Sequence, residues 1–276
     1  MDLTIHHSFG SQNSSYDTFS NILYTAISSL SKVNKINENQ FDLETSSSKA
    51  LTVKNVGEFT LVTEGKESLI KSGTIDELSV RRSDNYLNTA GFDILTATNV
   101  NMHIHKFLIC GYSNRSAGSV VKKLLQKSDS ITGSKGNDFL CSYRGNDTIY
   151  GGQGADIMYG GHGRDYFVYK SIQDSGVFAS TTINGSLQAG GNSYASAAFN
   201  DIILDFRSGR DKIDLTKINL SSKKCLTIVT DTYYSTDSRD QISYSLWVDE
   251  DTDGNPDMIV GFSETQKPLK LSDILI

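Results

Sequence analysis

GSKGNDFLC SYRGNDTIY GGQGADIMY GGHGRDYFV, residues 133–168, reads as four consecutive nonapeptides in one register. Each has glycine at its fourth position, aspartate at its sixth and an apolar residue at its eighth. Glycine permits backbone angles closed to other residues, so six residues can turn sharply before three residues run extended. A glycine-rich linker would not keep the aspartate and the apolar residue in phase, so the pattern predicts a stack of short strands.

Two nonapeptides would complete one coil of a parallel β-roll, so each repeat is expected to stack on the second repeat after it. Asp138 should then lie over Asp156, and Asp147 over Asp165. The middle residue of each short strand points inward, which predicts a shared interior made of Leu140, Ile149, Met158 and Phe167. The preceding nine residues, LLQKSDSIT, keep an aspartate in register but have no glycine. They are expected to cap the roll, because terminal repeats are usually atypical.

Stacked carboxylates predict a bound cation. Neighbouring strands lie about 4.8 Å apart, and two charges at that spacing repel by about 1 kcal/mol in water and by more in a less polar medium. Calcium suits such a site because it takes about six to eight oxygens from carboxylates and carbonyls. The expected metal-site residues are Gly133, Gly136, Asp138, Gly145, Asp147, Gly151, Gly154, Asp156, Gly160, Gly163, Asp165, Asp129 and Asp174. The nonapeptide resembles the calcium-binding repeat of RTX proteins.

The segments that follow, FVYKSIQDSG (167–176) and DIILDFRSGRDKIDLTKI (201–218), resemble the C-terminal calcium-binding domain of serralysin-type secreted metalloproteases. The resemblance implies that residues 124–276 form a roll with a β-sandwich-like cap. It also implies export of a bacterial protein through a type I channel, with its ABC transporter and outer-membrane partner, directed by an uncleaved terminal signal such as SDILI. The start of the chain lacks the basic and apolar regions of a signal peptide. We therefore expect a secreted, extracellular protein, and removal of residues 273–276 should block export without preventing folding.

Composition and missing motifs exclude several functions. The net charge is −6, with the acidic excess in the second half of the chain, which argues against nucleic-acid binding. No apolar window is long enough for a membrane span. The sequence has no H-E-x-x-H and no G-x-S-x-G motif, so a non-enzymatic protein is predicted, with an unrecognised N-terminal active site as the weaker alternative. Three cysteines without paired spacing, Cys110, Cys141 and Cys225, predict neither a disulfide framework nor a zinc site.

Residues 1–123 predict a separate α+β domain, an antiparallel sheet with two helices. Helical spacing covers residues 16–33 and 116–128, with alternating segments between them. The strings GEFTLVTEGKESLIKSGTIDELS and HKFLICGYSNRSAGSVVKKLL resemble the secreted haem carriers, or hemophores.

The haem-ligand positions of that family fall here on Lys35, Leu61 and Leu69, and leucine cannot ligate iron. The ligand of this domain therefore stays open. A haem or iron carrier that uses His103 or His105 is the alternative hypothesis.

The stretch VDEDTDGNPDM, residues 248–258, partly matches a second kind of calcium site. Asp249, Asp251, Asp253 and Gly254 fit the first half of an EF-hand loop, but Val260 stands at the twelfth position, where glutamate is needed. The flanking YSLWV and MIVGF predict strands, which favours a hairpin turn. Whether residues 249–257 bind calcium is left open by the sequence.

Overall fold

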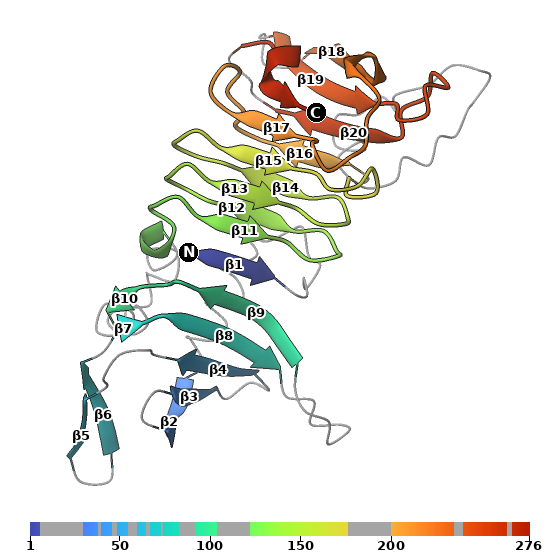
Figure 1. Cartoon of the computed structure of the whole chain (residues 1–276). Coiled ribbons are helices and arrows are strands. Elements are labelled where there is room, and N and C mark those ends of the chain that lie inside the picture. The colour runs from blue at the N-terminus through green and yellow to red at the C-terminus, as the bar shows by residue number, and fades with distance from the viewer. Residues whose placement is uncertain are drawn as a thin grey trace. The chain divides into compact units, whose positions relative to one another are not determined.

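The chain divides into two compact units, Met1–Ser130 and Ile131–Ile276. A computed structural model (Figure 1) describes residues 1–5, 30–37, 40–45, 49–54, 60–64, 67–72, 74–82, 92–103, 122–175, 200–234, 240–263 and 267–276. Among these residues, no helix has the length and apolar character needed to cross a membrane.

The first unit is an antiparallel sheet. Its strand order is β2–β3–β4–β8–β9–β1, formed by β2 (Leu30–Asn37), β3 (Gln40–Thr45), β4 (Lys49–Lys54), β8 (Glu77–Arg82), β9 (Phe92–Thr98) and β1 (Asp2–Ile5). Two smaller pairs join β5 (Thr60–Glu64) to β6 (Glu67–Ser72) and β7 (Thr74–Ile75) to β10 (Met102–His103). Ala97 lies opposite both Leu3 and Leu78, and all three side chains are buried. This cross-strand row forms part of the core of the unit.

The antiparallel sheet was predicted, but the two-helix plan is not supported. Residues 16–29 of the first expected helix lie outside the described residues, and its last residues belong to β2. This strand pairs with β3 through six residue pairs, with register shifts after Leu30 and after Lys35. Pairing with a neighbouring strand satisfies the backbone there, so tertiary contacts override the helical spacing. Of the second expected helix, residues 122–124 are helical and residues 116–121 lie outside the description.

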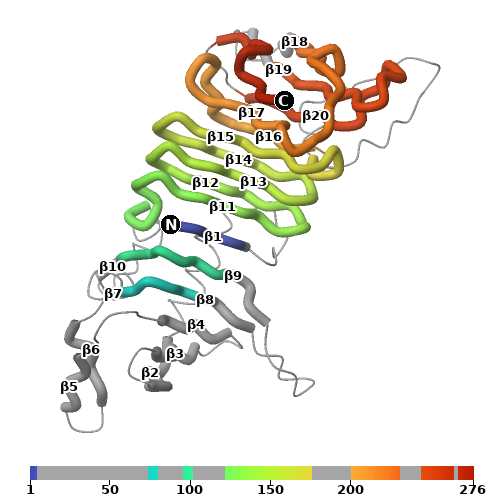
Figure 2. The backbone as a smooth tube through the Cα atoms, viewed as in Figure 1, coloured from blue at the N-terminus to red at the C-terminus, as the bar shows by residue number. Residues whose placement is uncertain are grey.

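The second unit is a roll of stacked coils built from two parallel sheets (Figure 2). One sheet contains β11 (Ser130–Thr132), β13 (Thr148–Tyr150), β15 (Tyr166–Val168), β17 (Lys212–Asp214) and β21 (Ile274–Leu275). The other begins with β12 (Phe139–Cys141), β14 (Ile157–Tyr159) and β16 (Asp201–Ile203). Leu140 pairs with Met158, and Ile149 with Phe167, so each repeat stacks on the second repeat after it, as predicted.

The middle residue of every repeat strand faces the interior of the roll. Leu140, Ile149, Met158 and Phe167 are each at most 2% exposed, which confirms the predicted core. The core continues beyond the repeats, because the ring of Phe206 lies 6.2 Å from that of Phe167 and 5.2 Å from that of Phe262, centroid to centroid.

The C-terminal cap continues both sheets of the roll. β20 (Met258–Phe262) pairs in parallel with β16 and antiparallel with β19 (Asp240–Val248), which in turn pairs with β18 (Leu226–Tyr234). β21 pairs in parallel with β17 in the other sheet. Two short 3-10 turns, Lys223–Cys225 and Leu271–Asp273, precede β18 and β21. The cap is thus made from the two facing sheets of the roll.

Candidate metal centre

A column of buried aspartates runs along one edge of the roll. The backbone N–H of Asp138 donates to Oδ1 of Asp156 at 2.8 Å, and the N–H of Asp156 donates to Oδ1 of Asp201 at 2.8 Å. We call Asp138, Asp156 and Asp201 the first column. The predicted stacking of Asp138 on Asp156 is confirmed, and the column extends one coil beyond the four repeats.

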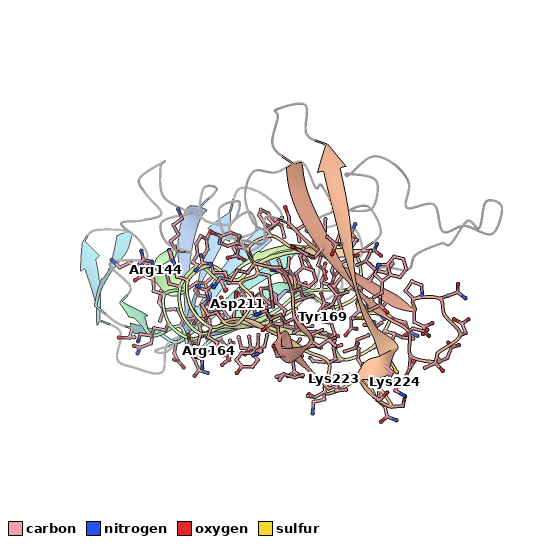
Figure 3. All side chains as sticks on the ribbon, turned by 90° about the horizontal axis from the view of Figure 1, so that it is seen from above. Arg144, Arg164, Tyr169, Asp211, Lys223 and Lys224 are labelled. Atoms are coloured by element: carbon pink, nitrogen blue, oxygen red, sulfur yellow. The ribbon has the colours of Figure 1, made fainter. Side chains whose placement is uncertain are left out.

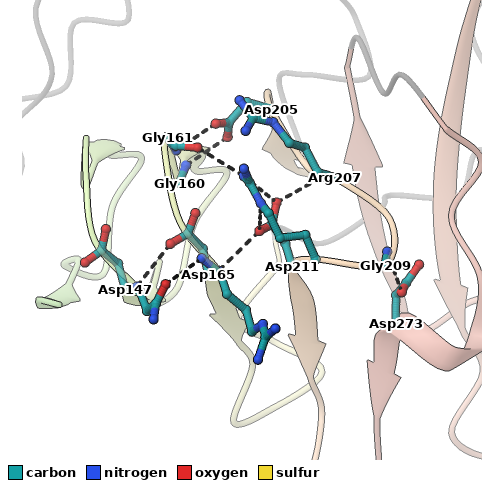
Figure 4. A network of polar contacts seen from close by, with 12 residues as sticks. Asp147, Gly160, Gly161, Asp165, Asp205, Arg207, Gly209, Asp211 and Asp273 are labelled. Carbon is teal, nitrogen blue, oxygen red and sulfur yellow. Dashed lines mark hydrogen bonds and ion pairs between the residues drawn. The ribbon is translucent and has the colours of Figure 1, made fainter.

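A second column follows the other edge (Figure 4). The N–H of Asp147 donates to Oδ1 of Asp165 at 3.0 Å, and the N–H of Asp165 donates to Oδ1 of Asp211 at 3.2 Å. We call Asp147, Asp165 and Asp211 the second column. Each carboxylate accepts from the coil stacked before it, so the fold itself brings like charges together in both columns.

The first-position glycines make room for these carboxylates. A Cβ on Gly151 would lie 2.3 Å from Oδ2 of Asp156, and a Cβ on Gly160 would lie 2.7 Å from Oδ2 of Asp165. Any larger residue would displace the aspartate of its own loop. Glycine is therefore required there by the close approach of a side chain, whereas at Gly133 a Cβ would meet the backbone carbonyl oxygen of Gly151 at 2.0 Å.

The fourth-position glycines are needed for backbone conformation. Gly145, Gly154 and Gly163 have φ angles of 138°, 122° and 145°, which other residues adopt only with strain. Gly136, the fourth-position glycine of the first repeat, is half-buried in its loop.

The second repeat has lost the glycines at its first two positions. Its Ser142 hydroxyl donates to the carbonyl of Gly160 at 2.7 Å. Tyr143 adopts the left-handed backbone that glycine has in the later repeats, with φ of 64°. The loop therefore keeps its shape despite the substitutions.

Burial makes the first column electrostatically costly. Burial first, and then the charge of Asp201, raises the pKa of Asp156 to about 9. Burial likewise raises the pKa of Asp201 to about 8, and the charge of Asp174 adds to the effect. Oδ2 of Asp156 has no hydrogen-bond partner within the described part of the chain. The cost of burying an ionised carboxylate in this position is not offset by a nearby positive charge among the described residues, and a bound cation would offset it.

The hydroxyl of Tyr169 is buried beside Asp201. Burial raises the pKa of this phenol well above its usual value, with the charge of Asp201 adding to the shift. The tyrosine therefore stays neutral and contributes an oxygen rather than a charge to the crowded end of the first column.

Burial also raises carboxyl pKa values in the second column, but by less than in the first. Burial raises the pKa of Asp165 to about 7, with the charges of Asp211 and Asp147 adding to it and Arg210 opposing it. Asp205 accepts hydrogen bonds from the backbone N–H groups of Gly160 and Gly161 at 2.8 Å and 2.7 Å. Burial raises the pKa of Asp205 as well. Several carboxylates thus converge on the loop of the fourth repeat.

The two outlying predicted ligands have clear structural partners. Asp129 is buried, and its Oδ1 lies 2.7 Å from the amino group of Met1. Burial raises the pKa of Asp129, and this amino group opposes the shift. Asp174 accepts from the N–H groups of Lys170 and Ser171 at 2.6 Å and 3.0 Å and from the Tyr150 hydroxyl at 3.2 Å. Asp174 closes a turn while adding negative charge beside the first column.

Asp201 and Asp211 were absent from the predicted site. Asp211 could have been found, because residues 206–214 (FRSGRDKID) keep glycine, aspartate and isoleucine at the fourth, sixth and eighth positions. Asp201 offers a weaker signal, an aspartate two residues before the buried Ile203. A glycine- and serine-rich insertion at about residues 179–198 separates it from the repeats and lies outside the described residues.

The loop at residues 249–257 is a hairpin turn between β19 and β20, as the flanking sequence predicts. One oxygen each from Asp249, Asp251 and Asp257 lie within 4.8 Å of one another. Asp253 instead accepts from the N–H of Asn255 at 2.7 Å, and Val260 is fully buried in β20. The EF-hand ligand set is therefore incomplete.

The positions considered for haem or iron ligands in the first unit are located by their strands, apart from His105. His103 pairs with Thr74 in the β10–β7 ladder, and His105 lies outside the described residues. Lys35, Leu61 and Leu69 are located only by their strands, β2, β5 and β6. In the second unit, neither Cys141 nor Cys225 forms a disulfide within the described part of the chain, and Cys110 lies outside the description.

Comparison with known proteins agrees with the geometry of the second unit. Residues 126–148 and 132–167 match the family model of the RTX calcium-binding nonapeptide repeat, and residues 188–276 match that of the peptidase M10 serralysin C-terminal region. Neither match reaches residues 1–125, so the resemblance to haem carriers has no support there. No protein of curated function matches the chain.

Two of the solved structures that match the chain are subunits of one enzyme. The AlgE6R3 subunit of the Azotobacter vinelandii mannuronan C5-epimerase is 22% identical, with a TM-score of 0.33, covering 54% of this chain and 78% of that one. The AlgE6R2 subunit of the same enzyme is 21% identical, with a TM-score of 0.25, covering 55% and 93%.

The second unit is therefore a calcium-binding β-roll. It carries RTX nonapeptide repeats followed by a C-terminal region of the serralysin type.

Proposed function

We propose that this chain is a secreted, non-enzymatic calcium-binding protein whose roll folds on calcium after type I export. The observation that carries the proposal is the pair Asp156 and Asp201, two fully buried carboxylates joined through one backbone N–H. Their raised pKa values mean that the folded roll without an ion must hold protons at these sites or tolerate the repulsion. Asp156, Asp174 and Asp201 would hold calcium at this edge, and Asp147 and Asp165 at the other.

Calcium would act on this chain as a folding switch. With calcium near 1 mM and a dissociation constant of about 0.1 mM, each site stabilises the folded state by about 1.4 kcal/mol. About four such sites together contribute about 5–6 kcal/mol, which is comparable with the stability of a small domain. Low calcium inside the cell would leave the roll pliable for export, and calcium outside would fold it.

The test is circular dichroism of the full chain after calcium has been removed by dialysis against a chelator. Calcium should restore β signal cooperatively in the millimolar range. Magnesium at the same concentration should not, because its octahedral preference fits these loops poorly. Sodium chloride at matched ionic strength controls for simple screening of the carboxylates. A second unit that is fully folded in excess chelator at neutral pH would refute the proposal.

We also propose that residues 1–123 bind a partner rather than catalyse a reaction. The support is the lack of a recognised catalytic motif in the sequence. A haemin titration of the full chain, followed at the Soret band, tests the competing hypothesis that the chain is a haem carrier. We expect no stoichiometric binding, whereas stoichiometric binding that the substitution His103→Ala removes would favour the carrier.

A further inference from the structure

Arg210 places a positive charge against the second column, and its side chain is 30% exposed. It occupies the fifth position of the loop 206–211, next to the column aspartate Asp211. Its Nε lies 3.0 Å from Oδ1 of Asp211, and its Nη2 lies 3.3 Å from Oδ2 of the same carboxylate. This forked contact is the strong form of a guanidinium–carboxylate pair.

The carboxylate of Asp211 is therefore fully satisfied by the protein. Oδ1 also accepts from the N–H of Asp165 at 3.2 Å, and Oδ2 also accepts from the N–H of Arg207 at 2.8 Å. Four donors fill the roughly four acceptor positions of a carboxylate. By contrast, Oδ2 of Asp156 and Oδ2 of Asp165 are buried without a hydrogen-bond partner among the residues described.

The same guanidinium reaches the preceding coil. Nη2 of Arg210 donates to the carbonyl of Gly161 at 3.1 Å, in the loop that ends at Asp165. Its charge also counteracts the rise in the pKa of Asp165. Arg210 thus interacts with one backbone carbonyl and with carboxylates from two successive coils, and these are the kinds of oxygen that calcium takes as ligands.

We propose that the guanidinium of Arg210 takes the place of one calcium ion, at the step between loops 160–165 and 206–211. The inference rests on the proposed function, since it assumes that the other steps of the roll bind calcium. The contact between these two loops then forms without an ion, and it joins the calcium-dependent coils to the C-terminal cap. In a stack whose coils contact only their neighbours, an already ordered end lowers the cost of ordering the next coil. Calcium would therefore fold the roll from its C-terminal end toward residue 133.

The experiment compares the full chain with two variants, Arg210→Gln and Arg164→Gln. Arg164 is the fifth-position residue of the preceding loop in the second column, it lies at the rim of the coil (Figure 3), and its side chain is exposed. Both variants remove one positive charge from the same edge of the roll. Bound calcium is counted by equilibrium dialysis, and the calcium midpoint of folding is measured by circular dichroism.

We expect Arg210→Gln to bind one more calcium ion than the parent chain. Losing a charge-assisted contact of this kind changes the folding equilibrium by a factor of about ten. When about four ions bind together, a tenfold change in the folding equilibrium is shared among them, so the calcium concentration at the folding midpoint rises about twofold. Arg164→Gln should match the parent chain in both measurements.

An unchanged ion count and midpoint in Arg210→Gln would overturn the inference. So would a variant that stays unfolded at saturating calcium, because calcium could then not replace the guanidinium. A parent chain that shows no calcium response at all would instead refute the proposed function, and the inference with it.

Discussion

The backbone N–H of Asp156 donates a 2.8 Å hydrogen bond to the carboxylate of Asp201, 45 residues further along the chain. The contact places a carboxylate outside the nonapeptide repeats directly in line with those inside them. The insertion after the fourth repeat therefore interrupts the sequence pattern without interrupting the column.

This contact predicts the effect of Asp201→Asn. The amide oxygen can still accept from the N–H of Asp156, but the negative charge that would attract calcium is gone. We expect the calcium midpoint of folding to rise by about twofold or more. Glu250→Gln, at an exposed position of the β19–β20 turn, removes the same charge as a control and should leave the midpoint unchanged. Equal calcium midpoints for the two variants would show that Asp201 does not contribute to calcium binding.

The raised carboxyl pKa values predict an unusual pH dependence without calcium. The pKa values of Asp165, Asp201 and Asp156 are raised to about 7, 8 and 9 in the folded chain, whereas an unfolded aspartate titrates near 3.9. Between these limits the folded state holds more protons, so its stability falls as pH rises. Calcium-free protein should show more β signal at pH 5 than at pH 8 by circular dichroism.

The same measurement at saturating calcium is the control. Carboxylates that hold calcium are ionised in both the folded and the unfolded states, so the slope between pH 5 and pH 8 should vanish. Calcium-free β signal that grows with pH would contradict the raised pKa values.

A matched pair of glycines separates crowding from backbone strain. Gly161 and Gly209 have similar φ angles, 82° and 85°, but a Cβ on Gly161 would lie 2.1 Å from the carbonyl oxygen of Tyr143, and a Cβ on Gly209 would meet nothing within 4 Å. Gly209→Ala should lower the free energy of unfolding only by the backbone strain, about 1–2 kcal/mol. Gly161→Ala should cost more, about 3 kcal/mol or above, because two coils must separate. Chemical unfolding at saturating calcium measures both, and equal losses would mean that the coils are not closely stacked there.

Deletion of residues 273–276 should destabilise the roll. Ile274 is buried and pairs with Ile213, and Asp273 accepts from the Ser208 hydroxyl at 2.7 Å and the Gly209 N–H at 3.0 Å. Burial alone would raise the pKa of Asp273, but these bonds and the Lys212 charge hold it below its usual value. These contacts therefore predict the opposite of the sequence-based expectation that folding survives this deletion. We expect the loss of the buried isoleucine alone to lower the free energy of unfolding by about 2–5 kcal/mol, as measured by chemical unfolding.

Export of the protein is better tested with Ile276→Ser, because Ile276 is 40% exposed. This variant should fold like the parent chain, so any loss of secretion through a co-expressed type I system would report on the export signal itself. Unchanged secretion of the Ile276→Ser variant would argue against a role for this residue in the signal.

The nine-residue register alone determined the stacking of the repeats. A period of nine places one aspartate and one apolar residue in each half-coil, so it predicted Asp138 over Asp156, Asp147 over Asp165 and the four interior side chains. These features depend only on local turn geometry and on alternation in a short strand, which residues within one repeat control. The helix expected over residues 16–33 failed where β2 begins, because a partner strand decided the conformation of Leu30–Asn37.

Tertiary structure alone decided which groups complete each column. Asp201 reaches Asp156 across an insertion, and the side chain of Arg210 turns inward onto Asp211 and Gly161 although Arg164, at the same position of the preceding loop, is exposed. The nine-residue pattern is the same whether a fifth-position side chain points outward or inward. The direction is set by the carboxylates and carbonyls of neighbouring coils, which come together only when the roll has formed, and their combined charge is what a cation must balance.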